Sequence, residues 1–173
     1  MILRNSFITI SLILLTACSS VLPLDYKNYE GSDAATIYIQ NKKGNIGTIY
    51  ITKYRYIEAD ACYEMDLRYE LDSNILAANG NVIESKVAPN GFYAIEQIQT
   101  KETHIWNLSS SFIPDAGKYY FISPGTGVAE IPDNLKISTS TNEDELFQKY
   151  GKNKVKGWVL KSKCKNFIGK LIN

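Results

Sequence analysis

Few residues of this chain belong to the types that perform catalysis. His104 is the only histidine among the 173 residues, so any Ser-His-Asp or Cys-His system would have to use it. The sequence has no Gly-x-Ser-x-Gly turn, which presents the nucleophilic serine of many hydrolases. We therefore expect His104 to be a surface or core histidine, and the protein not to be an enzyme.

Three carboxylates offer the best case for acid–base chemistry. Glu64, Asp66 and Glu70 alternate with apolar residues over residues 62–71, which predicts a strand with one solvated face. Side chains two positions apart on that face are about 7 Å apart, close to the separation of a glycoside hydrolase pair. A solvated strand face also carries such charges without any catalytic role, and we favour that interpretation.

The sequence predicts neither a metal site nor a phosphate loop. Cys62, Cys164 and His104 fall short of the four ligands of a structural zinc site. Residues 125–128 contain glycines, but no Lys-Ser or Lys-Thr follows them, so they predict a turn. We expect no cofactor.

The elements that would position these residues begin after an export signal. Arg4 precedes an apolar run over residues 8–15, and the small residues Thr16 and Ala17 follow it. This order is typical of a secretory signal peptide. The run is too short for a membrane span, which needs about 20 apolar residues.

The residues Leu15-Thr16-Ala17-Cys18 resemble the signal box of bacterial lipoproteins at every position. The resemblance implies cleavage before Cys18, a diacylglycerol on its thiol and an acylated amino group, so the membrane is the first expected partner. Such chains would hold the protein permanently, because stable anchoring needs at least two. Ser19 follows Cys18 in place of the aspartate that retains lipoproteins at the inner membrane, which favours the periplasmic face of the outer membrane. An ordinary soluble signal with a chance cysteine is the alternative.

With Cys18 acylated as the resemblance implies, Cys62 and Cys164 have only each other as partners. Exported proteins fold in oxidising compartments, where such cysteines form disulfides. We expect a Cys62–Cys164 bridge; two buried free thiols are the alternative.

The charge of the chain excludes one class and suggests another. Without residues 1–17 the side chains are net neutral, which argues against a nucleic-acid binder. Residues 146–173 nevertheless carry eight lysines and no acid. They either face acidic surface within the domain or bind an anionic glycan, a lipid headgroup or an envelope protein. The candidate contact residues are Lys154, Lys156, Lys161, Lys163 and Lys165.

Short strands separated by turns account for most of the chain. Residues 36–40 and 46–53 flank turn-forming residues and predict a hairpin, and Asn79-Gly80 is the preferred dipeptide of another tight hairpin turn. Further strands are expected near residues 92–95, 105–112 and 118–122, with a last one over 154–164. The 12 tyrosines suit β-sheets and could also stack on sugars or partners.

One helix is expected, over residues 141–151. Asn142 and its neighbours can cap its first turn, acidic residues follow, and Gly151 lies where a terminating glycine belongs. Residues 116–121, with 89–93 upstream, look like those of small bacterial lipoproteins with an immunoglobulin-like or prealbumin-like sandwich. The resemblance implies a mainly β, antiparallel sandwich and carries over no catalytic residue.

These observations predict a signal peptide over residues 1–17, an acylated cysteine with a flexible tether over 18–33, and one sandwich domain over 34–173. The expected function is that of a non-enzymatic envelope lipoprotein that presents the sandwich to a protein or a glycan. An envelope polysaccharide or peptidoglycan hydrolase, or an inhibitor of one, is an alternative. A docking subunit of a secretion or surface-structure machine is another.

Overall fold

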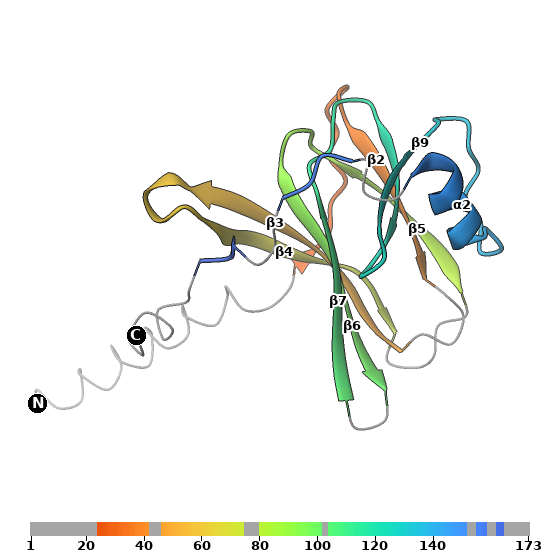
Figure 1. The fold of residues 1–173 in the computed structure, drawn as a ribbon, viewed down its shortest axis with the longest axis horizontal. Helices are drawn as coiled ribbons and strands as arrows, with labels where there is room; N and C mark the ends of the chain where they lie inside the picture. Colours follow the sequence, from red (N-terminus) through yellow and green to blue (C-terminus); the bar gives the residue numbers. More distant parts are fainter. Residues whose placement is uncertain are drawn as a thin grey trace, which may run out of the picture.

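A computed structural model describes residues 24–41, 46–74, 80–101, 104–151, 155–158 and 162–164, with the side chains of residues 74, 100, 101 and 104 left out. Two β-sheets face each other, and one helix lies on the smaller sheet (Figure 1). The larger sheet has the order β1-β4-β3-β6-β7, formed by Leu24–Asp25, Cys62–Asn74, Gly47–Ile57, Phe92–Lys101 and His104–Phe112. The smaller sheet has the order β5-β2-β8-β9, formed by Asn81–Val87, Ala35–Asn41, Tyr119–Ser123 and Gly127–Ile131.

The expected mainly β sandwich is confirmed, but its sheets are mixed rather than wholly antiparallel. β1 runs parallel to β4, with Leu24 opposite Tyr69. β2 runs parallel to β8 in the smaller sheet, with Ile37 opposite Tyr120. The remaining neighbours are antiparallel.

The main core fills the space between the two sheets. Alternate residues of each strand point inward, so the β-branched residues of β2 and β3 meet there. Each such side chain that leaves water stabilises the fold by roughly 1.5–3 kcal/mol. The fully buried members include Ile37, Ile39, Ile49, Ile51 and Ile95.

The predicted helix is confirmed as α2 (Glu143–Tyr150), which covers the outer face of the smaller sheet. The Asn142 side chain accepts hydrogen bonds from the amides of Asp144 and Glu145, at 3.1 and 3.4 Å. Gly151 ends the helix with φ at 86°, a backbone angle that favours glycine. The ring of Phe147 packs against Phe121 of β8 at 5.6 Å between centroids.

The two expected hairpins are wrong, because each connection crosses from one sheet to the other. β2 belongs to the smaller sheet and β3 to the larger, so the turn between them joins strands that do not pair. β4 and β5, which flank Asn79-Gly80, are separated in the same way. The β3–β4 and β6–β7 hairpins of the larger sheet extend beyond the smaller sheet (Figure 1).

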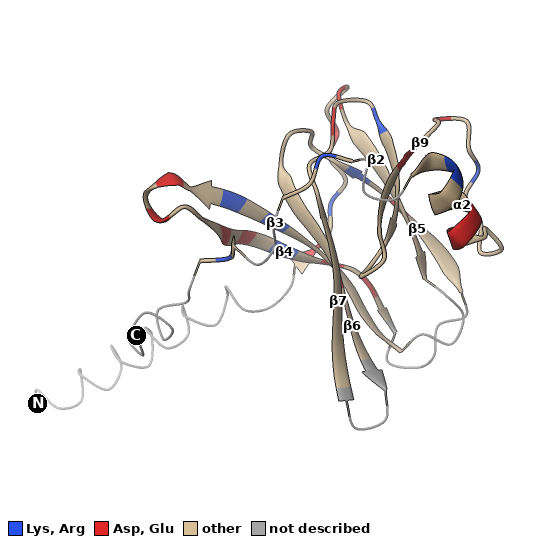
Figure 2. Ribbon diagram, viewed as in Figure 1, with Lys and Arg blue, Asp and Glu red and all other residues tan. Residues whose placement is uncertain are grey.

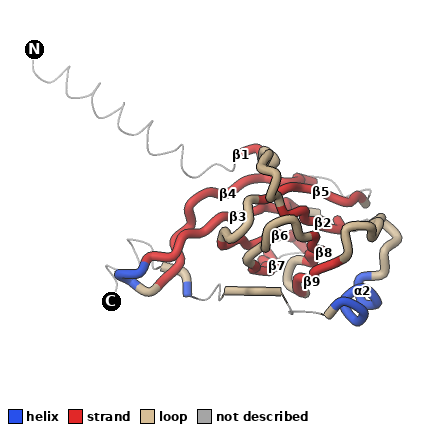
Figure 3. The backbone as a smooth tube through the Cα atoms, turned by 90° about the horizontal axis from the view of Figure 1, so that it is seen from above, coloured by secondary structure: helices blue, strands red, loops and turns tan. Residues whose placement is uncertain are grey.

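Residues 24–33 belong to the domain, and the expectation that they form a free tether is wrong. β1 pairs with β4, and the loop after it passes from the larger sheet toward the smaller one (Figure 3). There the amide of Tyr29 donates to the Lys86 carbonyl at 3.0 Å. The side chain of Asn28 accepts from the Lys86 amide at 2.8 Å. The preceding residues, including Cys18, lie outside the described part of the chain.

Candidate functional site

Irregularities in β4 decide which face each of its side chains occupies. Lys53 pairs with Leu67 but the next residue, Tyr54, pairs with Met65, so Asp66 is an extra residue on β4. This β-bulge shifts the alternation by one position, and the expected single face over residues 62–71 is wrong.

The bulge also separates the candidate carboxylates. Glu70 lies opposite Tyr50 and Glu64 lies opposite Arg55, two residues of β3 that face opposite sides of the sheet. Glu64 is bound to Arg55, with 2.6 Å between the carboxylate and Nη2. The expectation that these acids share one face is therefore wrong, and with it the geometry of a hydrolase pair between them.

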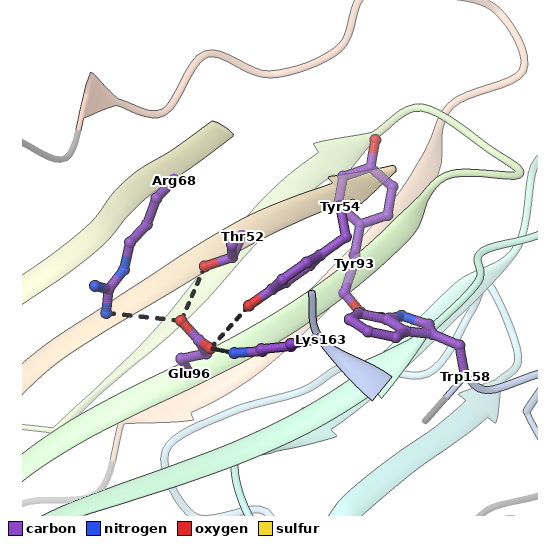
Figure 4. Close-up of polar contacts among 7 residues, drawn as sticks. All are labelled: Thr52, Tyr54, Arg68, Tyr93, Glu96, Trp158 and Lys163. Atoms are coloured by element: carbon purple, nitrogen blue, oxygen red, sulfur yellow. Dashed lines mark hydrogen bonds and ion pairs between the residues drawn. The ribbon is translucent and has the colours of Figure 1, made fainter. Parts of the chain in front are cut away.

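A different carboxylate, Glu96 of β6, is buried on the outer face of the larger sheet (Figure 4). Thr52 Oγ1 and the Tyr54 hydroxyl donate to it at 3.0 and 3.3 Å. Lys163 Nζ and Arg68 Nη2 lie 3.3 and 3.6 Å from its two oxygens. Both oxygens are thus engaged, so Glu96 anchors neighbouring segments and has no oxygen left for a substrate.

The protonation states of this cluster follow from its surroundings. Burial lowers the pKa of Lys163, but the Tyr54 hydroxyl and the Glu96 carboxylate raise it more, so the net pKa lies above its ordinary value. Burial is also the largest cause that raises the pKa of Tyr54. At neutral pH Lys163 is therefore charged and Tyr54 keeps its proton, as a stable ion pair requires.

The C-terminal segment, residues 155–158 and 162–164, lies over this face of the larger sheet. The expected Cys62–Cys164 disulfide is confirmed, with 5.0 Å between the two Cα atoms. Trp158 is buried among Tyr54, Tyr63 and Phe92. The expected strand over 154–164 is wrong for its described residues, which contain only an isolated parallel bridge between Tyr63 and Lys163.

The candidate contact lysines divide into three groups. Lys163 is bound to Glu96, as the interpretation of an internal acidic partner requires. Lys156 has an exposed side chain and remains a candidate. The third group lies outside the described residues and consists of Lys154, Lys161 and Lys165. Elsewhere on the larger sheet, basic and acidic residues lie side by side on the β3–β4 hairpin (Figure 2).

A groove of about 800 Å³ beside β1 is the strongest candidate for a binding site. Residues 24–30 form one wall, and side chains from β3, β4 and β6 form the floor. The lining contains four tyrosines, with polar or charged residues among them. The tyrosines are Tyr26, Tyr29, Tyr69 and Tyr93; the other side chains include Asp25, Lys27, Asn28, Glu30 and Lys53.

The tyrosines are held in fixed positions. Tyr26 meets Tyr69 edge to face, with 5.5 Å between ring centroids, and its hydroxyl donates to the Lys86 carbonyl. The Tyr29 hydroxyl donates to Asp33 at 3.0 Å. Burial raises the pKa of Tyr26 and of Tyr93, so both hydroxyls stay protonated at neutral pH. The groove therefore offers aromatic faces, hydroxyls and charges, which are groups that can contact a polar ligand.

Comparison with protein-family models, with curated proteins and with solved structures finds no match to this chain. Among the described residues, no three His, Cys, Asp or Glu side chains come together as a metal site would require. No described helix has the length and apolar character needed to span a membrane. The side chain of His104, the one histidine, lies outside the described set.

Sequence reasoning missed both the groove and the buried carboxylate. The groove was not predicted, because Pro23, Asn28 and Gly31 interrupt any periodic pattern and indicate a tether over residues 19–33. Tyr26 and Tyr29 were the available signal, since aromatic residues are rare in flexible linkers. Glu96 had no signal of its own, because its partners come from β3, β4 and the C-terminal segment.

Proposed function

We propose that this protein is a non-enzymatic, lipid-anchored envelope protein whose tyrosine-lined groove binds a glycan close to the membrane. The groove carries the proposal. Its volume of about 800 Å³ falls within the range of small-ligand sites, which combine aromatic walls with a few polar groups. Tyrosine rings suit the apolar faces of sugars, while Asn28, Lys53 and Asp25 can bind hydroxyl groups.

The position of the groove in the chain fits the proposed anchor. Leu24 lines the groove, and only residues 19–23 separate it from Cys18. Five residues span at most about 3.3–3.6 Å each, so an acylated Cys18 would hold the groove within roughly 20 Å of the bilayer. Ser19 supports the periplasmic face of the outer membrane as the location.

The proposal includes the finer class of the fold. We infer an immunoglobulin-like or prealbumin-like sandwich from Gly117-Lys118-Tyr119-Tyr120, which leads into β8 at the centre of the smaller sheet. Tyr120 is fully buried in the core there, and its hydroxyl accepts a hydrogen bond from the Asp115 amide at 2.9 Å.

Calorimetric titration of the full protein with soluble peptidoglycan fragments and envelope polysaccharides tests the binding. The variant Tyr29→Ala should weaken the affinity about two- to tenfold, because an aromatic contact contributes about 0.5–1.5 kcal/mol. Tyr56→Ala is the matched control, since Tyr56 is 44% exposed, Tyr29 is 37% exposed, and Tyr56 lies outside the groove. Absence of binding to every glycan, or equal effects of both variants, would contradict the proposal.

The anchor is tested separately. Intact mass and membrane fractionation of the protein expressed with its own signal, beside Cys18→Ala, should show an acylated membrane form only for the native sequence. A soluble, unacylated product from the native sequence would refute the anchor and leave the groove to be judged by the titration alone.

A further inference from the structure

The four outer edges of the two sheets differ in how they are protected. β1 has only two residues and leaves much of the outer edge of β4 uncovered, but that part of β4 carries charged residues such as Glu64, Asp66 and Arg68. β9 has five residues and is followed by Pro132. The edge of β5 is covered at Lys86, whose amide and carbonyl are bound by Asn28 and Tyr29. β7 has nine residues, which makes it the longest edge strand in the described part of the chain.

The C-terminal segment covers one end of the β7 edge. The amide of Ile113, just after β7, donates to the Lys156 carbonyl at 2.8 Å. The backbone groups of alternate residues on a strand point to the same edge. Ser109, Asn107 and Ile105 therefore direct their amides and carbonyls to this edge, where no described residue pairs with them.

The open part of β7 is uncharged, and two of its exposed residues are apolar. Ile105 is 76% exposed and Trp106 is 55% exposed. No Asp, Glu, Lys or Arg occurs from Ile105 to Pro114. Natural edge strands usually carry lysine, proline or another device that prevents pairing with a second strand. The open part of β7 lacks all of these, whereas β5 carries Glu84 and Lys86.

We propose that β7 pairs antiparallel with β7 of a second copy of this chain, around a two-fold axis at Asn107. In such an interface the residue at the axis faces its own equivalent, and its neighbours face each other in reciprocal pairs. A charge near the axis would therefore meet a like charge, so the uncharged edge suits self-pairing. The register also places Trp106 beside Leu108 of the second copy, an apolar cross-strand contact.

The dimer is tested by sedimentation of the full protein, in density-matched detergent if Cys18 is acylated and in plain buffer if it is not. The native protein should dimerise, and Asn107→Lys should raise the dissociation constant about two- to fivefold, because it places two like charges opposite each other. Asn107 is exposed, so the substitution should leave thermal unfolding of the monomer unchanged. Met65→Lys is the matched control, since Met65 is 50% exposed on β4 and away from β7.

Disulfide trapping tests the register. The two Asn107 residues would form a hydrogen-bonded pair with Cα atoms about 5.5 Å apart, a distance that a disulfide bridges. Asn107→Cys should give a covalent dimer under oxidation and Met65→Cys should not. A native protein that stays monomeric at concentrations on the order of 100 μM, or a dimer that Asn107→Lys leaves intact, would overturn the proposal. These outcomes are independent of glycan binding.

Discussion

Removal of the disulfide between Cys62 and Cys164 should lower the stability of the domain more than most single changes. The bridge joins residues 102 positions apart. In the chain-entropy model, a loop of that length restricts the unfolded chain by about 4.7 kcal/mol at 25 °C. Domains of this size have a total unfolding free energy of about 5–15 kcal/mol. We therefore expect the double variant Cys62→Ser/Cys164→Ser to lose about one third or more of its stability.

The assay is thermal and urea unfolding of the native protein and the double variant, each with and without reductant. A loss of about 4.7 kcal/mol corresponds to a melting temperature lower by roughly 10–20 °C. Reductant should destabilise the native protein by the same amount and leave the variant unchanged. A loss below about 1 kcal/mol would refute the reasoning. It would mean that the C-terminal segment contributes no long-range restraint to the unfolded chain.

Three other predictions concern single contacts. Trp158→Phe should cost about 1–3 kcal/mol in urea unfolding, because the indole donates to the Tyr93 carbonyl at 2.9 Å and the buried acceptor would lose its partner; an unchanged midpoint would contradict it. Asn142→Ala should cost about 1 kcal/mol by removing the helix cap, whereas Asn142→Asp should retain most of that stability. Stability should fall as pH rises through about 10 and above. The reason is that Lys163 and Tyr54 both have pKa values that are raised in the folded state. The stability that they provide is therefore complete below their unfolded pKa values and is lost as pH rises through their folded pKa values. Lys163 also lowers the pKa of Tyr54, so the test uses the double variant Lys163→Met/Tyr54→Phe. It should flatten this alkaline decline, and an equal decline in both proteins would argue against the Glu96 cluster as its cause.

Features that depend on residues close together in the chain were predicted more accurately than features that depend on residues far apart in it. The helix over residues 143–150 was predictable because its cap, its apolar positions and its terminal glycine all act within one short segment. β1 and the start of β9 were missed, because they lie in the expected tether and in the expected turn over residues 125–128. Most other strand positions were predictable for the same reason as the helix, since β-branched and aromatic residues favour extended backbone locally. The partners of those strands were not, as the connection from β2 to β3 shows. A turn sequence specifies a change of direction, but burial of both faces decides which sheet receives the next strand.

The candidate sites show the same division. The pairing of Cys62 with Cys164 followed from the expected acylation of Cys18, which left no other partner. The faces of β4 depended on a one-residue bulge at Asp66, which no local pattern marks and which arises from pairing with β3. The groove likewise required residues 24–30 to dock against strands more than 20 positions away.

By itself the sequence determined most of the extended segments, the helix, and the pair of cysteines that forms the bridge. These properties depend on residue type and on neighbours within a few positions. Only the tertiary structure decided that Glu96 is buried beneath Lys163, that tyrosines line a groove, and that β7 lies at one edge of the larger sheet. Each of those features brings together residues distant in the chain, and long-range packing selects among arrangements that local preferences leave equally favourable.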